Sequence, residues 1–323
     1  MRRRDFIALL AGGAVALPRV VRAQPIPVIV FFNSGTPSTY VKNVAAFRNG
    51  LKEAGLVEGQ NFAIEFVWAE NRFDGLETLA AEVIARRPAV IVSNTLAATR
   101  AKSSTTTIPI VFTTGSDPIR DGLVTSLNRP GGNVTGVVFI SGTLGGKRLE
   151  LLRQFVPKAR TIAMLVHPGT SETDGERAEV EAAARAVGQQ IRIFEIRNTT
   201  EIETAVAAAV AAGAGALLIG AGTFGFNNRV AIVESTARHA IPAMYATRES
   251  VEAGGLMSYG ASLPDAFGQA GLYAGRILKG EKPGDLPVIQ SVKLDLMINL
   301  KTAKSLGLEF HPQLLATADE VIE

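Results

Sequence analysis

Two segments of the chain approach motifs that bind nucleotides or phosphates, and each lacks a required residue. Residues 220–225 fit the pattern G-x-G-x-x-G, whose backbone approaches a dinucleotide pyrophosphate. The acidic residue expected about 20 positions later is missing, because residues 238–241 read RHAI. Residues 141–148 resemble a phosphate loop without its first glycine, and Arg148 stands where Ser or Thr would hold magnesium. Dinucleotide chemistry stays open as an alternative, and a cleft loop and a helix start are the simpler interpretations.

The other reactive side chains form no catalytic or metal-binding pattern. The chain has no cysteine, which excludes disulfides and thiolate catalysis, and no G-x-S-x-G segment that would expose a serine nucleophile. Its three histidines, His167, His239 and His311, lack the spacings typical of zinc sites. We therefore expect no catalytic residue, no cofactor and no metal. His239 is interpreted as a helix C-cap, and His167 either contacts a ligand or packs within its loop.

The elements that position these residues follow a regular alternation. Apolar runs alternate with helical patterns, which predicts an α/β fold with parallel sheets covered by helices on both faces. Strands are expected at 28–32, 62–68, 89–92, 110–113, 134–140, 161–166, 191–196, 216–219, 243–246, 256–259 and 288–298. Helices are expected at 40–54, 74–86, 176–187, 201–212, 228–239 and 265–278.

The second half of the pattern repeats the first. Residues 32–36 match 166–170, and residues 108–112 match 241–245, at offsets of 133 or 134 positions. Chance similarity between βα units is the alternative. Two copies of one βα architecture predict two similar doubly wound parallel-sheet lobes, joined by a hinge and separated by a cleft.

Polar loops are expected to meet at that cleft, at 33–39, 93–95, 113–118, 167–173, 220–227 and 245–249. In open α/β sheets, loops at the carboxyl ends of strands lead into helix N-termini, whose free N–H groups favour anions. The residues expected to bind a ligand are Ser34, Thr36, Ser93, Asn94, Thr95, Thr114, Asp117, His167, Thr170, Thr223, Phe224 and Tyr245. Helix N-termini favour a carboxylate, and Phe224 and Tyr245 favour a flat or apolar body. As alternatives, Phe224 and Tyr245 belong to the core, and Asp117 caps a helix before Pro118.

The first 23 residues have the parts of a secretory signal: a basic start, a short apolar stretch and small residues before Gln24. Arg3 and Arg4, followed by Phe6 and Ile7, resemble a twin-arginine export signal, with an ordinary signal peptide as the alternative. This segment holds five of the 33 basic and one of the 30 acidic residues, so 28 and 29 remain and the net charge changes from +3 to −1. We expect an exported periplasmic protein that is not a lipoprotein and has no nucleic-acid partner.

Several segments carry a specific family likeness. They read SDP at 116–118, PGGNVTGV at 130–137, GGLMSYG at 254–260, RILKG at 276–280, LPV at 286–288, INLKTAKSLGL at 298–308 and ADEVIE at 318–323. In these segments the chain closely resembles the tryptophan-binding, TrpX-like family of ABC-transporter substrate-binding proteins. The resemblance implies a type I periplasmic binding fold with three crossing segments. It also implies an inner-membrane ABC permease with a cytoplasmic ATPase as partner.

The expected lobes are residues 25–138 plus 258–286, and residues 139–257 plus 287–323. Their crossings are expected near 139–142, 254–259 and 287–290. We expect a monomeric receptor that captures a small carboxylate, an amino acid or an aromatic acid, and delivers it to an importer. The alternatives are an exported dinucleotide-dependent oxidoreductase and a ligand-sensing partner of a membrane receptor.

Overall fold

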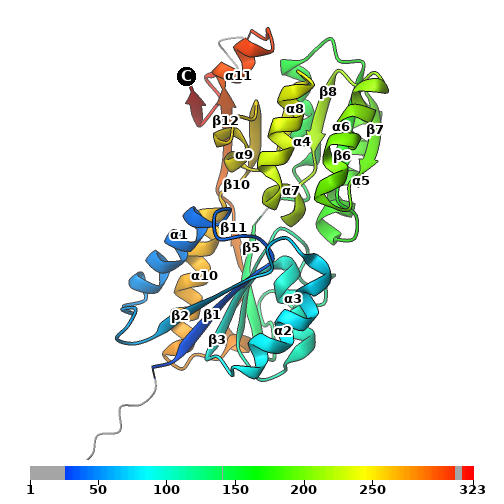
Figure 1. Cartoon of the computed structure of the whole chain (residues 1–323). Coiled ribbons are helices and arrows are strands. Elements are labelled where there is room, and N and C mark those ends of the chain that lie inside the picture. Colours follow the sequence, from blue (N-terminus) through cyan, green and yellow to red (C-terminus); the bar gives the residue numbers. More distant parts are fainter. Residues whose placement is uncertain (1–25, 140, 310–314) are drawn as a thin grey trace, which may run out of the picture.

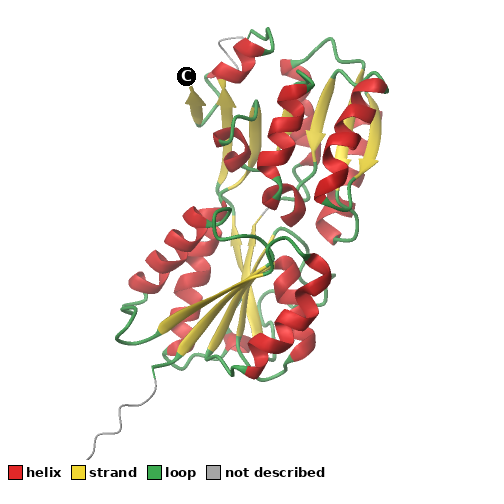
Figure 2. Cartoon of the chain, viewed as in Figure 1, coloured by secondary structure: helices red, strands yellow, loops and turns green. Residues whose placement is uncertain are grey.

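The computed structural model describes residues 26–139, 141–309 and 315–323, which form two lobes (Figure 1). The expected leader at 1–23 and His311 lie outside these residues. None of the helices in the described ranges is long and apolar enough to cross a membrane. Each lobe is one twisted sheet with helices on both faces (Figure 2).

The first lobe is built on a six-stranded sheet in the order β11-β5-β4-β3-β1-β2, and all of its pairs are parallel. Its strands are β1 (Val28–Asn33), β2 (Ala63–Trp68), β3 (Val90–Asn94), β4 (Ile110–Thr114), β5 (Val134–Phe139) and β11 (Ile289–Ser291). Helices α1 (Val41–Glu53) and α10 (Leu263–Leu278) pack on one face of this sheet. Helices α2 (Leu76–Ala85) and α3 (Thr95–Ser104) pack on the other.

The second lobe has a seven-stranded sheet in the order β13-β12-β10-β9-β8-β6-β7. Its strands are β6 (Thr161–Val166), β7 (Gln190–Glu195), β8 (Ala216–Ile219), β9 (Ala243–Tyr245), β10 (Met257–Ala261), β12 (Leu294–Asn299) and β13 (Glu320–Ile322). Only the β10–β12 pair is antiparallel among these. Helices α4 (Gly145–Phe155) and α5 (Ser171–Ala186) cover one face, and α6 (Ile202–Ala211) and α8 (Arg229–Arg238) cover the other. The short helices α7 (Thr223–Asn227), α9 (Arg248–Glu252) and α11 (Leu300–Ser305) complete the lobe.

The two sheets repeat one connectivity. The order β2-β1-β3-β4-β5 in the first sheet matches β7-β6-β8-β9-β10 in the second. Strands β1 and β6 begin at Val28 and Thr161, and β4 and β9 at Ile110 and Ala243, each pair 133 residues apart. The α/β fold with two similar lobes, predicted from the repeat, is therefore confirmed.

The chain changes sheets at three places, and two of them differ from the expected boundaries. Strand β10 pairs with β9 and β12, so Ser258–Ala261 belongs to the second sheet and not to the first. Strand β11 pairs with β5, so Ile289–Ser291 belongs to the first sheet and not to the second. The single strand expected at 288–298 is two strands, because the run switches sheets around the exposed Val292. An apolar run fits a buried strand in either sheet, and its composition does not reveal the switch.

Candidate functional site

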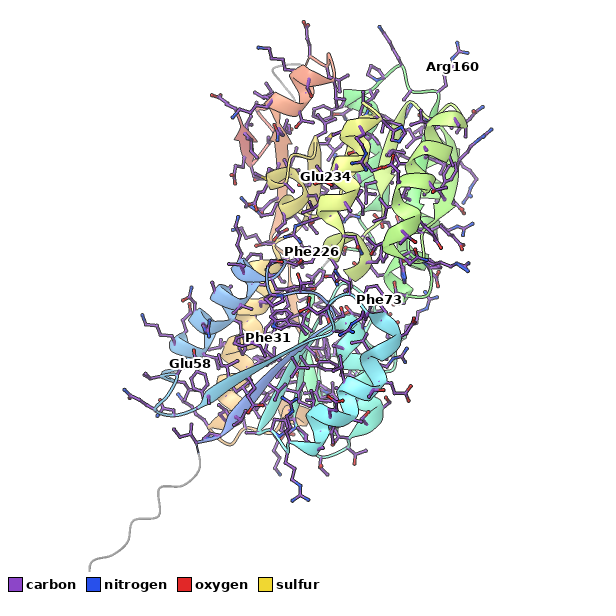
Figure 3. The ribbon with its side chains drawn as sticks, viewed as in Figure 1. Phe31, Glu58, Phe73, Arg160, Phe226 and Glu234 are labelled. Atoms are coloured by element: carbon purple, nitrogen blue, oxygen red, sulfur yellow. The ribbon has the colours of Figure 1, made fainter. Side chains whose placement is uncertain are left out.

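A cavity of about 40 Å³ lies where the carboxyl ends of strands from both lobes face each other. The side chain of Phe226 lies at this junction of the lobes (Figure 3). The cavity is lined by polar and aromatic residues of both lobes: Tyr40, Asn94, Thr95, Thr113, Phe139, Ser141, Glu172, Gly222, Thr223, Phe226, Thr247, Leu263 and Phe267.

A hydrogen-bond chain around Tyr40 crosses from one lobe to the other. The Asn94 amide Nδ2 donates to the Ser34 hydroxyl at 2.8 Å and to the Tyr40 phenol oxygen at 3.1 Å. The Tyr40 hydroxyl in turn donates to Asn227 Oδ1 of the second lobe at 3.1 Å. Burial raises the pKa of Tyr40 above its usual value, so the phenol stays protonated and remains a donor. The chain ties the first-lobe loop to α7 when the lobes are together.

Aromatic rings form the apolar side of the cavity. The rings of Tyr40 and Phe226 meet edge to face with centroids 5.1 Å apart, and Phe267 lies 5.9 Å from Tyr40. Phe139, at the end of β5, lines the cavity as well. Such walls favour a flat, apolar body, because rings pack well edge to face or offset.

Glu172 is the acidic residue of the cavity. It lies in the first turn of α5, is 4% exposed, and its Oε1 has no hydrogen-bond partner among the described residues. Burial raises the pKa of this carboxyl to about 7, and the Ser141 side chain offsets part of that increase. When it is ionised, a buried carboxyl with an unpartnered oxygen needs a partner that donates a hydrogen bond or carries positive charge.

The N-terminus of α3 provides a partial positive charge, which is opposite in sign to the Glu172 carboxylate. Asn94 occupies the N-cap position with extended backbone but makes no side-chain cap hydrogen bond. Its Oδ1 accepts the Ser34 N–H instead, and its Nδ2 donates to the hydroxyls of Ser34 and Tyr40. Asn94 and Thr95 both line the cavity. The first N–H groups of this ten-residue helix and its dipole therefore favour negative charge at this side of the cavity.

A fully buried ion pair supports the second-lobe side of the cavity. The Arg148 guanidinium binds the Glu176 carboxylate, and both side chains are 0% exposed. Arg148 Nε also donates to the Tyr259 carbonyl at 2.7 Å and Nη2 to the Ser141 carbonyl at 3.4 Å. Glu176 Oε2 accepts the Ala221 N–H at 2.5 Å. One cluster thus holds together the crossing segment at Ser141, strand β10, helix α5 and the loop before α7.

This cluster also explains the two near-motifs of the sequence. Residues 145–148 form the first turn of helix α4, which confirms the helix-start interpretation. In the glycine-rich segment 220–225, the Ala221 N–H is bound by Glu176, and the segment ends in the five-residue helix α7. That N–H is therefore not free to bind a pyrophosphate.

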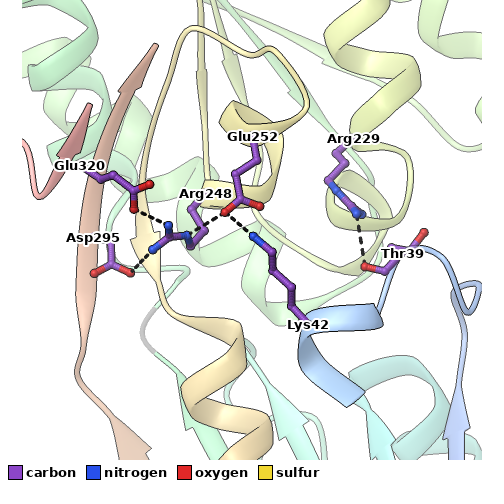
Figure 4. A network of polar contacts seen from close by, with 7 residues as sticks. All are labelled: Thr39, Lys42, Arg229, Arg248, Glu252, Asp295 and Glu320. Atoms are coloured by element: carbon purple, nitrogen blue, oxygen red, sulfur yellow. Dashed lines mark hydrogen bonds and ion pairs between the residues drawn. The ribbon is translucent and has the colours of Figure 1, made fainter. Parts of the chain in front are cut away.

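Polar contacts on the outer side of the junction also join the lobes (Figure 4). Lys42 of α1 lies 2.7 Å from Glu252 of α9, and Arg229 Nη2 donates to the Thr39 carbonyl at 3.2 Å. Within the second lobe, Arg248 holds Glu252 in place through a 3.2 Å hydrogen bond.

Five of the residues expected to bind a ligand lie at the cavity or bond to it. Asn94, Thr95 and Thr223 line it. Ser34 accepts from Asn94, and Thr114 accepts from the Thr95 hydroxyl at 3.0 Å. In β4 it is Thr113 that lines the cavity, because successive side chains of a strand point to opposite faces.

Four others have local structural roles instead. Thr36 accepts the Thr39 N–H in a turn, and Thr170 is the N-cap of α5. Asp117 accepts the N–H groups of Ile119 and Arg120, but residues 118–122 form a turn and not the helix that the capping alternative expected. Ser93 is fully buried in the first lobe.

The remaining three expected residues pack away from the cavity. His167 stacks on Phe224 at 4.7 Å, and Phe224 belongs to a core cluster of the second lobe. Burial lowers the pKa of His167, which favours the neutral ring. Tyr245 is buried in the same cluster and bonds the Thr236 hydroxyl at 2.7 Å. Phe224 and Tyr245 are therefore core residues.

The residues that the sequence did not single out lie close to those it did. Phe226 is two positions after Phe224, and Thr247 is two positions after Tyr245, in loops that were expected at the cleft. Tyr40 directly follows an expected loop. Glu172 lay in an expected loop too, and a carboxylate near an apolar strand end was the signal that would have identified it.

Two hinged lobes around a polar and aromatic cavity define the class of two-lobed ligand-binding proteins. The family described as ABC transporter substrate binding protein matches residues 26–322. The chain belongs to this family, which confirms the family resemblance and the role of solute-binding receptor inferred from it.

Relatives of known structure and specificity agree with this assignment. A tyrosine-binding protein of Clostridioides difficile (strain R20291) is 26% identical over 265 residues, 81% of this chain and 76% of that protein. The ABC domain in complex with L-Trp from Streptococcus pneumoniae is 26% identical, with a TM-score of 0.83 over 92% of this chain and 99% of that chain.

A second solved relative shows which arrangement the lobes adopt here. The ligand-free, open structure of a substrate binding protein with adhesive properties from Clostridium difficile is 25% identical, over 92% of this chain and 99% of that chain, but its TM-score is 0.65. At nearly equal identity, the lobes of this chain are thus arranged more like those of the L-Trp complex than those of the open structure.

Proposed function

We propose that this protein is an exported, monomeric receptor that captures a small carboxylate with a flat apolar body, an amino acid or an aromatic acid, between its lobes. It then presents the closed complex to an inner-membrane ABC permease. The observation that carries the proposal is a cavity with an uncapped helix N-terminus on one side and aromatic rings on the other. Relatives that bind tyrosine and L-Trp support the same ligand class.

The ligand carboxylate lies at the N-terminus of α3. There the N–H groups of the first turn donate to it, and the helix dipole adds to the attraction. The flat part of the ligand packs against Tyr40, Phe226 and Phe267. Because these groups come from both lobes, the ligand makes its full set of contacts only in the closed state.

Closure is the mechanism of capture. A ligand that contacts both lobes binds the closed state better than the open one, and it shifts the equilibrium by that difference in affinity. The hydrogen bond from Tyr40 to Asn227 and the ion pair of Lys42 with Glu252 form between the lobes in the closed state. The receptor performs no chemistry on the ligand in this proposal.

A thermal-shift screen of residues 24–323 tests the proposal, with L-amino acids, aromatic acids, sugars and nucleotides as probes. A ligand of the native state raises the unfolding temperature as its concentration rises above its Kd. We expect increases with aromatic amino acids or aromatic acids, and compaction by small-angle X-ray scattering with the same probes. Stabilisation by sugars or dinucleotides alone would contradict the proposal.

A further inference from the structure

Two aromatic side chains reach from one lobe into the other, and both lie at the junction of the lobes (Figure 3). Phe226 of the second lobe packs in a core cluster of the first lobe, with Tyr40 and Phe267. Phe73 of the first lobe packs against a core cluster of the second lobe, which contains Phe224. Phe226 lines the cavity and Phe73 does not, so contact with a ligand does not account for the position of Phe73.

The Phe73 ring contacts two rings of the second lobe. Its centroid lies 6.0 Å from that of His167 and 6.2 Å from that of Phe224, in tilted arrangements. Aromatic pairs attract each other at centroid distances of about 4.5–7 Å. His167 stacks on Phe224, and burial lowers the pKa of His167, which favours its neutral ring. The contact of Phe73 with the second lobe is therefore an apolar one.

This contact lies at the mouth of the cleft, on the side away from the crossing segments. The crossings adjoin β5 and β11 in the first sheet and β10 and β12 in the second, at or next to one edge of each sheet. Phe73 follows β2, and residues 196–199 follow β7, and these strands form the opposite edges. The two loops line a hollow of about 790 Å³ together with His167. Lobes that swing about the crossings separate most at the mouth, so a contact there opposes opening with the greatest leverage.

The backbone that leads to Phe73 has a strained shape. Glu70 and Asn71 have left-handed φ angles of 51° and 61°, which residues other than glycine rarely adopt. Such residues persist where their surroundings fix them, and the Glu70 N–H donates to the Gly35 carbonyl at 3.1 Å. The Asn71 N–H donates to the Ser34 carbonyl at 3.0 Å. The loop that carries Phe73 is thus fixed to the loop after β1 at the cavity.

We propose that Phe73 is the gate residue of the cleft, whose ring, packed against His167 and Phe224 of the second lobe, sets how slowly the closed receptor releases its ligand. The inference rests on the proposed capture by closure and adds the residue that limits release. The cavity measures about 40 Å³, so a ligand leaves only after the lobes part. Phe73 contacts the second lobe only in the closed state. Loss of these contacts therefore speeds opening and leaves the encounter with the open state nearly unchanged.

Stopped-flow fluorescence tests the proposal. The reporter is Trp68, the only tryptophan of the chain, whose ring lies 5.8 Å from the Tyr40 ring at the cavity. The probes are L-phenylalanine, L-tyrosine and 3-phenylpropionate, which contain no indole and leave the tryptophan signal clear. The variants are Phe73→Ala, Phe73→Leu and Leu79→Ala. Leu79 lines the same hollow and packs against the same first-lobe core cluster as Phe73, and it serves as control.

We expect Phe73→Ala to release a bound probe about 5- to 100-fold faster than wild type, because two ring contacts of the closed state are lost. Its association rate should change less than about threefold. The acceleration should be the same for every probe that binds, because Phe73 does not line the cavity. Phe73→Leu keeps an apolar side chain and should recover part of the slow release. Leu79→Ala should lower the unfolding free energy and leave the release rate close to that of wild type.

Each other outcome overturns a defined claim. Equal release rates in Phe73→Ala and Leu79→Ala would overturn the gate and leave the proposed receptor standing. Binding of none of the probes by wild type, with stabilisation by a sugar or nucleotide instead, would overturn the proposed function and the gate together. If Phe73→Ala fails to fold, His167→Ala decides, because it removes a partner ring on the second-lobe side and should also speed release. Unchanged release in His167→Ala contradicts the proposal.

Discussion

The Tyr40 hydroxyl of one lobe donates a 3.1 Å hydrogen bond to Asn227 Oδ1 of the other, in the wall of the cavity between the lobes. The same phenol oxygen accepts from Asn94, which precedes the α3 N-terminus. One side chain therefore couples the cavity-facing end of α3 to contact between the lobes, and a change at Tyr40 acts on closure as well as on the cavity.

Removal of this hydroxyl should weaken ligand binding more than it weakens the fold. Tyr40→Phe keeps the ring packing but leaves the amides of Asn94 and Asn227 short of a partner, at a cost of about 1–3 kcal/mol to the closed state. Calorimetry measures the loss of affinity. Tyr273→Phe is the control, since its hydroxyl bonds the Pro287 carbonyl within the first lobe. Equal losses of affinity in both variants would contradict a role in closure.

Loss of the Lys42–Glu252 ion pair should have a small, salt-dependent effect. The Lys42 side chain is 62% exposed, and such pairs contribute about 0–1 kcal/mol. We expect Lys42→Ala to lower ligand affinity less than about fivefold at low salt, and less still at high salt. Arg48→Ala, which breaks a pair with Glu58 inside the first lobe, should leave affinity unchanged. A tenfold loss that persists at high salt would show that Lys42 acts through something other than this pair.

The buried Arg148–Glu176 pair should matter for stability. Arg148→Met leaves an unpaired carboxylate in a site that is 0% exposed, which costs about 3–5 kcal/mol of unfolding free energy. Glu176→Gln added to this variant removes the buried charge and keeps an acceptor for Ala221, so part of the loss should be recovered. Denaturant titration of both variants measures these free energies, and additive losses would refute the coupling.

Gly115→Ala should hinder closure while the fold stays intact. Its methyl group meets the Glu172 carboxyl of the second lobe only when the lobes are together, whereas the Phe139 ring belongs to the same lobe as Gly115 and must shift in either state. We expect weaker ligand binding with little change in unfolding free energy. Gly75→Ala is the matched control, because an added Cβ there meets nothing within 4 Å. Unchanged affinity in Gly115→Ala would show that the cavity accommodates the methyl group.

Closure without ligand should depend on pH through Glu172. In the closed protein burial raises the pKa of this carboxyl to about 7, and in an open cleft it returns toward the ordinary value of 4.5. A proton therefore binds the closed state more tightly, so the closed fraction rises as pH falls from about 7 to 4.5. Small-angle scattering at pH 5 and pH 8 measures this, and Glu172→Gln should lose most of the difference.

The repeat in the sequence was sufficient to predict the architecture. Strand runs such as Val28–Asn33 and Thr161–Val166 are almost entirely apolar, which indicates strands buried on both faces, and the offset between the halves predicted two equivalent sheets. The loops at the cavity were predicted as well, because carboxyl ends of parallel strands meet at one edge. Asn94, Thr95 and Thr223 were found in this way.

The sequence by itself pointed to the family through the likeness of its segments at 254–260 and 298–308. It also determined the two-lobed fold and the loops at the cleft, because periodicity and turn residues are local properties of the chain. Only the tertiary structure decided which side chain of each loop faces the cavity. Phe224 and Phe226 have the same chemistry, yet one packs in the core and the other against Tyr40. Only the tertiary structure showed that Glu172 is buried with one oxygen that has no hydrogen-bond partner among the described residues. Its burial depends on Gly115 and Phe139 of the opposite lobe, which lie far away in the sequence.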